Sequence, residues 1–369
     1  TNDKYVAQMV SRFKRDVLKI WNVSFDGSKP IIINLAKEGY EDEYHELDVN
    51  HDKIVITAGT SAGVLRALSY IQDIAQSKGA FCLKKGVTKR TPKLKSRIIY
   101  SYSGLYNDSL DVDSRIHCPD ELLERYARVG VNGIWIQGIL YMLAKFPFAP
   151  SLSEGYEKRM EFLKDFADRA KAYGIKIYIY INEPRAMPAS FYDKYPEIKG
   201  HTFDNKMHSL CTSTPEVQKY LYDAINFICS TVPDIGGFIT ITRTENQSNC
   251  YSHNKVINCP RCSKRKMQEV VSEVVGIYAK AAHEVNPDIK VIAWDWSWRD
   301  DKLENFMNPM ETKECIELLP EDVILMCTRE RGIKTNVGGI QGEVMDYSIS
   351  VPGIGPFTTD GWKWAKDSG

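Results

Sequence analysis

The 369-residue sequence has no net charge, because 48 lysines and arginines balance 48 aspartates and glutamates. Without a basic excess, no global field draws the chain to nucleic acid or to an anionic lipid surface. The sequence also has no apolar run near the length of about 18 residues that a membrane span requires, and its start lacks the charged and apolar regions of a signal peptide. These absences favour a neutral partner in water.

Two further features are missing. The glycine-containing run 352–356 has no Lys-Ser/Thr pair to hold a phosphate, so we expect a turn there and not a nucleotide loop. The cysteine count is nine, and an odd number argues against a fully paired disulfide framework. Six cysteines outside the cluster described below are expected to be buried thiols: Cys82, Cys118, Cys211, Cys229, Cys315 and Cys327.

The pattern changes near residue 90. Before it, helical apolar spacing predicts helices over 5–20 and 61–77, and β-branched content predicts three strands. Those strands are expected over 30–39, 41–50 and 53–60. We therefore predict an α+β accessory domain over residues 1–92, with the basic segment 84–95 as a joint to the next domain.

After the joint, continuous apolar strands alternate with helices, which is typical of parallel strands buried on both faces. Seven strands are predicted, over 97–102, 133–138, 175–181, 237–242, 289–296, 323–327 and 344–350. The clearest helices are predicted over 120–130, 157–174 and 215–230. The pattern predicts an α/β fold, a TIM-type (β/α)8 barrel over residues 93–369 whose last unit is missing from this chain, and we expect the eighth strand beyond Gly369.

A metal-binding loop is predicted over residues 246–264. Cys250-x2-His253-x5-Cys259-x2-Cys262 has the ligand types and spacing of a tetrahedral zinc site. Four protein ligands close the shell, so a structural zinc is expected, with no organic cofactor. A disulfide such as one between Cys259 and Cys262, or free thiols, remain the alternatives.

Carboxylates follow the predicted barrel strands, where side chains converge on one end of a barrel. Hydrolysis of a glycosidic bond needs two such groups, one protonated and one ionised. Glu245 is predicted as the general acid, or alternatively as the partner of a rim ion pair with Arg243. The second carboxylate is left open among Glu330, Asp295 and, behind these two, Asp346, whose predicted place inside a strand favours a hydrogen-bonding role.

Other polar and aromatic residues near the strand ends are predicted to bind sugar. Trp296 and Trp298 are candidates to stack on a sugar ring if the strand ends at Asp295, with packing between the barrel and its helices as the alternative. Asp346 is assigned to hydrogen bonding with a sugar hydroxyl. The remaining candidate contacts are Tyr102, Gln137, Glu183, Arg243 and Tyr347.

The segments EGYEDEYHELDV (38–49) and KIVITAGTSAGVLRALSYIQDI (53–74), followed by a barrel with Glu245 after its fourth strand, carry a resemblance to known enzymes. The chain resembles the β-hexosaminidases of glycoside hydrolase family 20 and the α-glucuronidases of family 67, which share an N-terminal domain. The resemblance implies a periplasmic or secreted glycosidase that removes sugars from the end of a glycan, and it implies that the opposing carboxylate comes from a late strand. Family 20 carries an Asp-Glu pair where this chain has Thr244 before Glu245, so the Asp that orients an N-acetyl group is absent.

A second class of function is a carbohydrate-binding barrel that has lost turnover. A third is a zinc-dependent hydrolase. Paired-carboxylate catalysis predicts a bell-shaped pH profile, whereas binding without turnover or turnover sensitive to a chelator would favour the second or the third. The oligomeric state is left open.

Overall fold

The computed structural model describes residues 3–36, 42–100 and 109–369. The chain forms two compact units. Unit 1 comprises Thr1–Tyr106, Asp113–Trp135 and Lys164–Ile177, and unit 2 comprises Asn107–Val112, Ile136–Leu163 and Tyr178–Gly369. The predicted boundary at residue 92 stays a prediction, and each unit is described below by itself.

Unit 1 contains a four-stranded sheet with the strand order β1-β3-β2-β4. Its strands are β1 (Ile31–Leu35), β2 (His45–Val49), β3 (Ile54–Ala58) and β4 (Gly86–Arg90). β1 runs parallel to β3, whereas β2 is antiparallel to both β3 and β4. The first three strands lie where the sequence predicted them. β4 corrects the expectation of a joint over 84–95, because this polar segment forms an edge strand, where few of its residues need burial.

The two predicted helices of this layer are also present, as α1 (Lys4–Trp21) and α2 (Ser61–Lys78). Asp3 caps α1 by accepting hydrogen bonds from the backbone N–H groups of Tyr5 and Val6, at 2.8 and 3.0 Å. The buried face of α1 packs in one apolar cluster with α2 and with the β2 and β3 strands. The α1 residues of that cluster are Val6, Met9, Phe13 and Val17, at helical spacing.

The second sheet has six strands among the described residues, in the order β12-β11-β10-β7-β6-β5. They are β5 (Ile98–Tyr100), β6 (Gly133–Gln137), β7 (Lys176–Ile181), β10 (Gly237–Ile241), β11 (Lys290–Trp294) and β12 (Ile324–Met326). The strand pairs β5–β6, β7–β10, β10–β11 and β11–β12 are all parallel. Because each strand lies beside its neighbour in the sequence, the sheet is a half-barrel of a TIM-like domain.

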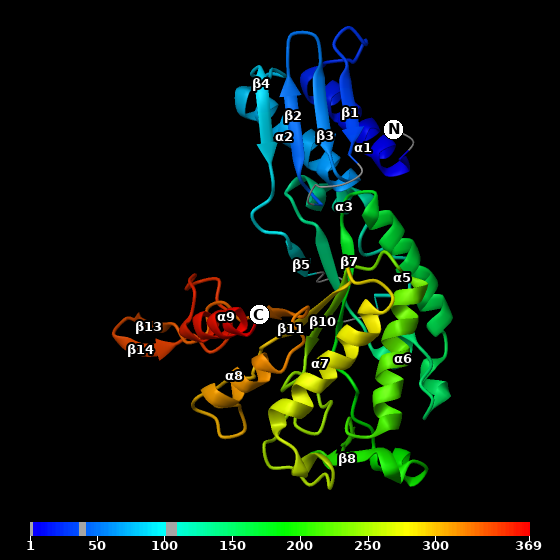
Figure 1. Cartoon of the computed structure of the whole chain (residues 1–369), viewed down its shortest axis with the longest axis vertical. Helices are drawn as coiled ribbons and strands as arrows, with labels where there is room; N and C mark the ends of the chain where they lie inside the picture. The colour runs from blue at the N-terminus through cyan, green and yellow to red at the C-terminus, as the bar shows by residue number, and fades with distance from the viewer. Residues whose placement is uncertain (1–2, 37–41, 101–108) are drawn as a thin grey trace. The chain divides into compact units, whose positions relative to one another are not determined.

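Helices connect the strands as the alternating pattern predicted. They are α3 (Asp120–Arg128), α4 (Leu140–Leu143), α5 (Tyr156–Lys171), α6 (Pro215–Thr231), α7 (Met267–His283), α8 (Pro309–Glu317) and α9 (Pro356–Ser368). In unit 2, α6 and α7 pack side by side (Figure 1). A short antiparallel pair, β8 (Lys199–Thr202) and β9 (His208–Leu210), lies between β7 and α6 in the chain. No helix in the described part of the chain is both long enough and apolar enough to cross a membrane.

The seventh barrel strand, predicted over 344–350, is wrong: these described residues form no strand. Instead, β13 (Lys334–Val337) and β14 (Ile340–Glu343) form a hairpin just before them. The backbone of Val344 then exchanges hydrogen bonds with Gly332 and Ile333. The apolar residues that predicted a buried strand leave Ile349 98% exposed, so this segment lies at the surface and not inside a sheet.

Gly237 allows the backbones of β10 and β11 to approach each other closely. Its φ is +145°, and a Cβ built on it would lie 1.9 Å from the carbonyl oxygen of Lys290 in the paired strand. We predict that Gly237→Ala destabilises the protein by about 2–5 kcal/mol, from backbone strain and overpacking together. Urea unfolding followed by circular dichroism measures the change.

Gly276→Ala is the matched control. Gly276 lies inside α7, and its Cβ would meet only Pro320 Cγ at 3.8 Å, an ordinary contact. Alanine should stabilise this position by about 0.5–1 kcal/mol, because it suits a helix interior better than glycine. Equal effects of the two substitutions would contradict the close approach at Gly237.

Candidate active site

Glu245 lies just beyond β10, at the edge where parallel strands of a barrel end. The residue before it, Thr244, has φ 64°, a conformation that a β-branched residue rarely adopts. The turn is held by backbone hydrogen bonds from Thr244 N–H to the carbonyl of Ser252 (2.6 Å) and from Glu245 N–H to the carbonyl of Arg243 (3.0 Å). Strained backbone of this kind is often found at functional sites, so the local geometry itself marks Glu245.

The carboxyl of Glu245 is half-buried and its pKa is raised from its usual value. Burial is the largest cause, the positive charge of Arg185 opposes it, and the negative charge of Asp346 adds to it. A carboxyl with a raised pKa stays protonated closer to neutral pH. It can therefore give a proton to a leaving group.

Asp346 is the carboxylate whose charge acts on Glu245. Burial raises the pKa of Asp346, while Arg331 and a hydrogen bond from the Trp296 side chain lower it. Its Oδ1 is buried and has no hydrogen-bond partner within the described part of the chain. The Trp296 ring stacks on Trp294, with 5.5 Å between ring centroids and 27° between planes. One carboxylate oxygen of Asp346 is thus held by the protein, and the other has no hydrogen-bond partner in the described part of the chain.

Asp295, which was predicted as a catalytic candidate, bridges β11 and β12. Its Oδ1 accepts a hydrogen bond from the backbone N–H of Thr328 at 3.1 Å. Burial raises the pKa of Asp295 to about 6, against the opposing effects of Cys327, Thr328 and Arg331. It lines a cavity of only about 10 Å³ together with residues of α9, including Gly361. That volume has room for about one water and no sugar.

Glu330, predicted as the other candidate for the second carboxylate, is 8% exposed. Its Oε2 accepts a long hydrogen bond of 3.5 Å from the backbone N–H of Ser348. Arg329 lies 3.9 Å from its other oxygen. These contacts give Glu330 the role of anchoring the segment that carries Asp346.

Three of the predicted sugar contacts are buried in the protein. Trp298 is 0% exposed and its indole N–H donates to Thr242 Oγ1 at 3.0 Å, so it packs inside the barrel and cannot stack on a ligand. Arg243 is 1% exposed, and its guanidinium faces Met267 and the carbonyl of Asn305. This placement also excludes the predicted rim ion pair between Arg243 and Glu245. The sequence could not show which way these side chains turn at a strand end.

Glu183 is the third buried residue, at 2% exposed. Its carboxylate accepts hydrogen bonds from the backbone N–H groups of Leu140 (2.9 Å) and Arg185 (3.0 Å), and the Arg185 side chain lies 3.5 Å away. Glu183 therefore positions Arg185, the cation that acts on Glu245. Apolar periodicity does not reveal Arg185, although its place four residues after the end of β7 is a sequence signal for a residue near the site.

The other predicted contacts are distributed as follows. Gln137 ends β6 and is half-buried, whereas Tyr347 is 65% exposed beside Asp346 in the chain. Tyr102 lies outside the described residues. Trp296 is also partly accessible, next to Asp346.

The predicted metal cluster has a different fourth member. Cys250, Cys259 and Cys262 lie together with Cys211, and the four sulfur atoms are all within 4.8 Å of one another. His253 is not in this group. Its ring lies against Phe203, with 5.7 Å between ring centroids, and hydrogen-bonds to the backbone of Asn246. The spacing of a linear motif could not reveal Cys211, because it precedes the other three by about forty residues and joins them only through the fold.

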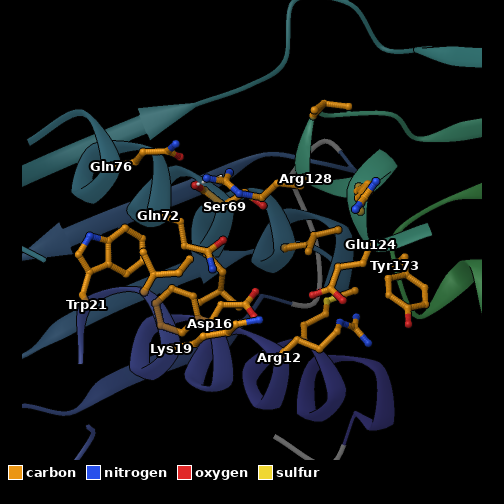
Figure 2. Close-up of a pocket in the computed structure, with 18 residues that line it drawn as sticks. Arg12, Asp16, Lys19, Trp21, Ser69, Gln72, Gln76, Glu124, Arg128 and Tyr173 are labelled. Atoms are coloured by element: carbon orange, nitrogen blue, oxygen red, sulfur yellow. Dashed lines mark hydrogen bonds between the residues drawn. The ribbon is translucent and has the colours of Figure 1, made fainter. Parts of the chain in front are cut away.

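Unit 1 contains a separate cavity of about 740 Å³ between α1, α2 and α3 (Figure 2). Two of the cationic groups that line it have partners within the protein. Arg12 lies over the Tyr173 ring at 4.1 Å, and Arg128 pairs with Asp73 at 2.7 Å. The carboxylates described above all belong to unit 2, so we place the candidate active site there and not at this cavity.

Comparison with protein-family models finds no match, and neither does comparison with curated protein sequences. Solved structures do match. A chitobiase of family GH20 from Flavobacterium johnsoniae aligns with a TM-score of 0.54 and 16% identity, over 89% of this chain and 54% of its own. The chain has the fold of these glycoside hydrolases.

Two further structures agree. A GH138 enzyme that targets pectin rhamnogalacturonan II aligns with a TM-score of 0.62 and 13% identity, over 91% of this chain and 38% of its own. A GH20 β-N-acetylhexosaminidase from Streptomyces coelicolor aligns with a TM-score of 0.52 and 12% identity, over 91% and 72%. The chain thus spans about half of the chitobiase and under two fifths of the GH138 enzyme. The resemblance stated from the sequence is confirmed at the level of fold.

Asp295 gives a test of the electrostatics. Its pKa is about 6 in the folded protein and about 3.9 in an unfolded chain. The folded state therefore binds this proton more tightly than the unfolded chain does. As the pH rises from about 4 to about 6, the folded protein loses stability because the buried carboxyl resists ionisation. We predict that Asp295→Asn gains about 3 kcal/mol relative to wild type as the pH rises through this interval, since the amide cannot ionise and keeps an oxygen for Thr328.

The measurement is urea unfolding of both proteins from pH 4 to pH 7. Asp204→Asn, at an exposed aspartate, is the control for the substitution itself. A difference between Asp295→Asn and wild type that stays flat over this pH range would contradict a raised pKa at Asp295.

Proposed function

We propose that this protein is a glycoside hydrolase in which Glu245 is the general acid and Asp346 the second carboxylate. The observation that carries the proposal is the pair itself: a half-buried carboxyl after β10 whose pKa is raised by burial and by the charge of Asp346. The fold shared with glycoside hydrolases supports the same reading. The proposal replaces Glu330 and Asp295 as second carboxylate, because both are engaged in holding the scaffold.

The two carboxyls differ in what stabilises their anions. Asp346 has Arg331, the Trp296 side chain and the backbone of Tyr347, whereas Glu245 has Arg185 alone. Asp346 therefore ionises first, and its negative charge then holds the proton on Glu245. This is the division of roles that glycoside hydrolysis requires, with one group protonating the leaving oxygen and the other activating water or attacking the sugar carbon.

Trp296 links the chemistry to sugar binding. It hydrogen-bonds to Asp346 and stacks on Trp294, so its orientation is fixed before a substrate arrives. A fixed aromatic face beside a carboxylate suits a sugar ring, which presents C–H groups to the ring and hydroxyls to the acid. We assign Trp296 to the sugar subsite and Gln137 to a hydroxyl contact there.

The substrate class follows from the residues around Glu245. Thr244 stands where an N-acetyl-orienting aspartate would be needed, which favours a sugar without an N-acetyl group. The test panel therefore includes aryl hexosides and hexuronides, and fragments of pectin rhamnogalacturonan II because a structurally similar enzyme targets that glycan. Aryl N-acetylglucosaminides and chitobiose are included as the competing class.

We predict that Glu245→Gln lowers kcat by about 100-fold or more on substrates with poor leaving groups, the usual scale for loss of a general acid. Asp346→Asn should lower kcat by at least a similar factor. The wild-type pH profile of kcat/KM should be a bell, because activity needs Asp346 ionised and Glu245 protonated. Glu245→Gln should lose the alkaline limb of that bell.

Glu330→Gln is the matched control, since it keeps an oxygen for the Ser348 N–H and should change kcat less than about threefold. Loss of activity in Glu330→Gln with full activity in Asp346→Asn would reverse the assignment. Binding of the panel sugars with no turnover would favour a carbohydrate-binding protein instead. Retained activity in Glu245→Gln on poor leaving groups would exclude Glu245 as the acid.

A further inference from the structure

We propose that Cys211, Cys250, Cys259 and Cys262 bind one zinc ion in a closed tetrathiolate site that holds the loop carrying Glu245. The proposal concerns a metal site and does not depend on the reaction that the protein catalyses. It assigns to Cys211 a role that the linear motif gave to His253.

The positions of the sulfur atoms match the shell of a zinc ion. Cys211 Sγ lies 3.5 Å from Cys259 Sγ and 3.6 Å from Cys262 Sγ, and all four sulfurs lie within 4.8 Å of one another. Tetrahedral zinc with Zn–S bonds of about 2.3 Å needs sulfurs about 3.8 Å apart. The observed spacing is close to this edge length, and four soft thiolates in a tetrahedral arrangement select zinc or iron.

The surroundings also suit a metal with four thiolates. All four cysteines are fully buried, so the shell excludes solvent. Arg261 Nε donates to Cys211 Sγ at 3.2 Å, and the hydroxyls of Ser209 and Ser213 lie 3.2 Å from the sulfurs of Cys250 and Cys262. Zinc with four thiolates has a net charge of about −2, and these donors offset it.

The cysteine cluster fits against β8 because residue 200 is a glycine. A Cβ at Gly200, in β8, would lie 2.7 Å from Cys250 Sγ and 2.3 Å from Ser209 Oγ. Tyr251 holds the turn that contains Cys262. Its hydroxyl donates to the carbonyls of Cys262 and Arg265 at 3.0 Å each. The site thus joins the segment before α6 to the loop before α7.

The same loop fixes the acid. Asn249 Nδ2 donates to the carbonyl of Thr242 at 2.7 Å, and Thr244 N–H donates to the carbonyl of Ser252 at 2.6 Å. Cys250 lies between Asn249 and Ser252, so pinning its sulfur holds both contacts to the end of β10. With four protein ligands the zinc has no open position, which makes it a structural ion and not a catalytic one.

The first test is metal content. The full chain, purified without chelator, should contain about one zinc per chain by elemental analysis, and loading the apoprotein should release thiol protons as the four cysteines bind. Cobalt loading should give the intense visible bands of tetrahedral thiolate coordination. Iron in place of zinc, or protein with intact free thiols that takes up neither zinc nor cobalt, would overturn the assignment.

The second test identifies the fourth ligand. Cys211→Ser should weaken zinc binding by more than the roughly 10–100-fold that follows loss of a supporting contact, and should change the cobalt spectrum. His253→Ala should keep the zinc and the spectrum. Cys229→Ser is the matched control, at an equally buried cysteine outside the cluster. Zinc lost in His253→Ala and retained in Cys211→Ser would overturn the proposal.

A third test uses two variants and keeps the proposal testable if Cys211→Ser fails to fold. Arg261→Met leaves all four ligands in place and removes one donor to Cys211, so zinc affinity should fall by about 10–100-fold with the fold intact. Lys264→Met, at a neighbouring basic residue of the same loop, is the control and should leave affinity unchanged. Equal affinities of the two variants would contradict thiolate coordination at Cys211.

Discussion

The burial of β10 between β7 and β11 is the constraint on which the candidate site depends. β10 is buried along its whole length, and parallel pairing on both sides sets its register. Glycine at position 237 lets the strand approach β11 more closely than any side chain would permit. With the strand fixed at its start, the chain leaves the sheet at one defined place, and Glu245 follows from there.

The elements that the sequence predicted well are those governed by periodicity. The helices α1 and α2 and the strands β7, β10 and β11 follow from apolar spacing, because burial on one face or on both leaves a regular pattern. The strand predicted over 344–350 does not form. Apolar content does not say whether a neighbouring element exists to cover the side chains, and Met345, Tyr347 and Ile349 are 50%, 65% and 98% exposed. β4 was missed because a polar edge strand carries no apolar signal.

The candidate site was predictable in its location but not in its pairing. Strand-end logic identified Glu245, Asp295 and Glu330 as carboxylates near one edge, since position in the chain decides which end of a strand a residue occupies. It placed Asp346 in a seventh strand that does not form. It could not show that Thr328 holds Asp295 or that Ser348 contacts Glu330, because backbone groups bind any carboxylate that reaches them. The spacing of the linear motif could not reveal Cys211 either, because three of the four cysteines share one loop while Cys211 comes from another segment of the chain.

The two carboxylates of the proposed pair are supported in different ways. Glu245 follows directly from a ladder of parallel hydrogen bonds, whereas Asp346 lies in a segment without strand pairing that is fastened at separate points, through Val344 and through the contact of Ser348 with Glu330. A strand ladder resists displacement along its whole length, whereas isolated contacts leave the backbone between them less restrained. The separation of the two oxygens, which distinguishes inversion from retention of the anomeric centre, is therefore governed by a loop and not by the barrel. Relatives with this barrel could change stereochemical outcome through that loop alone.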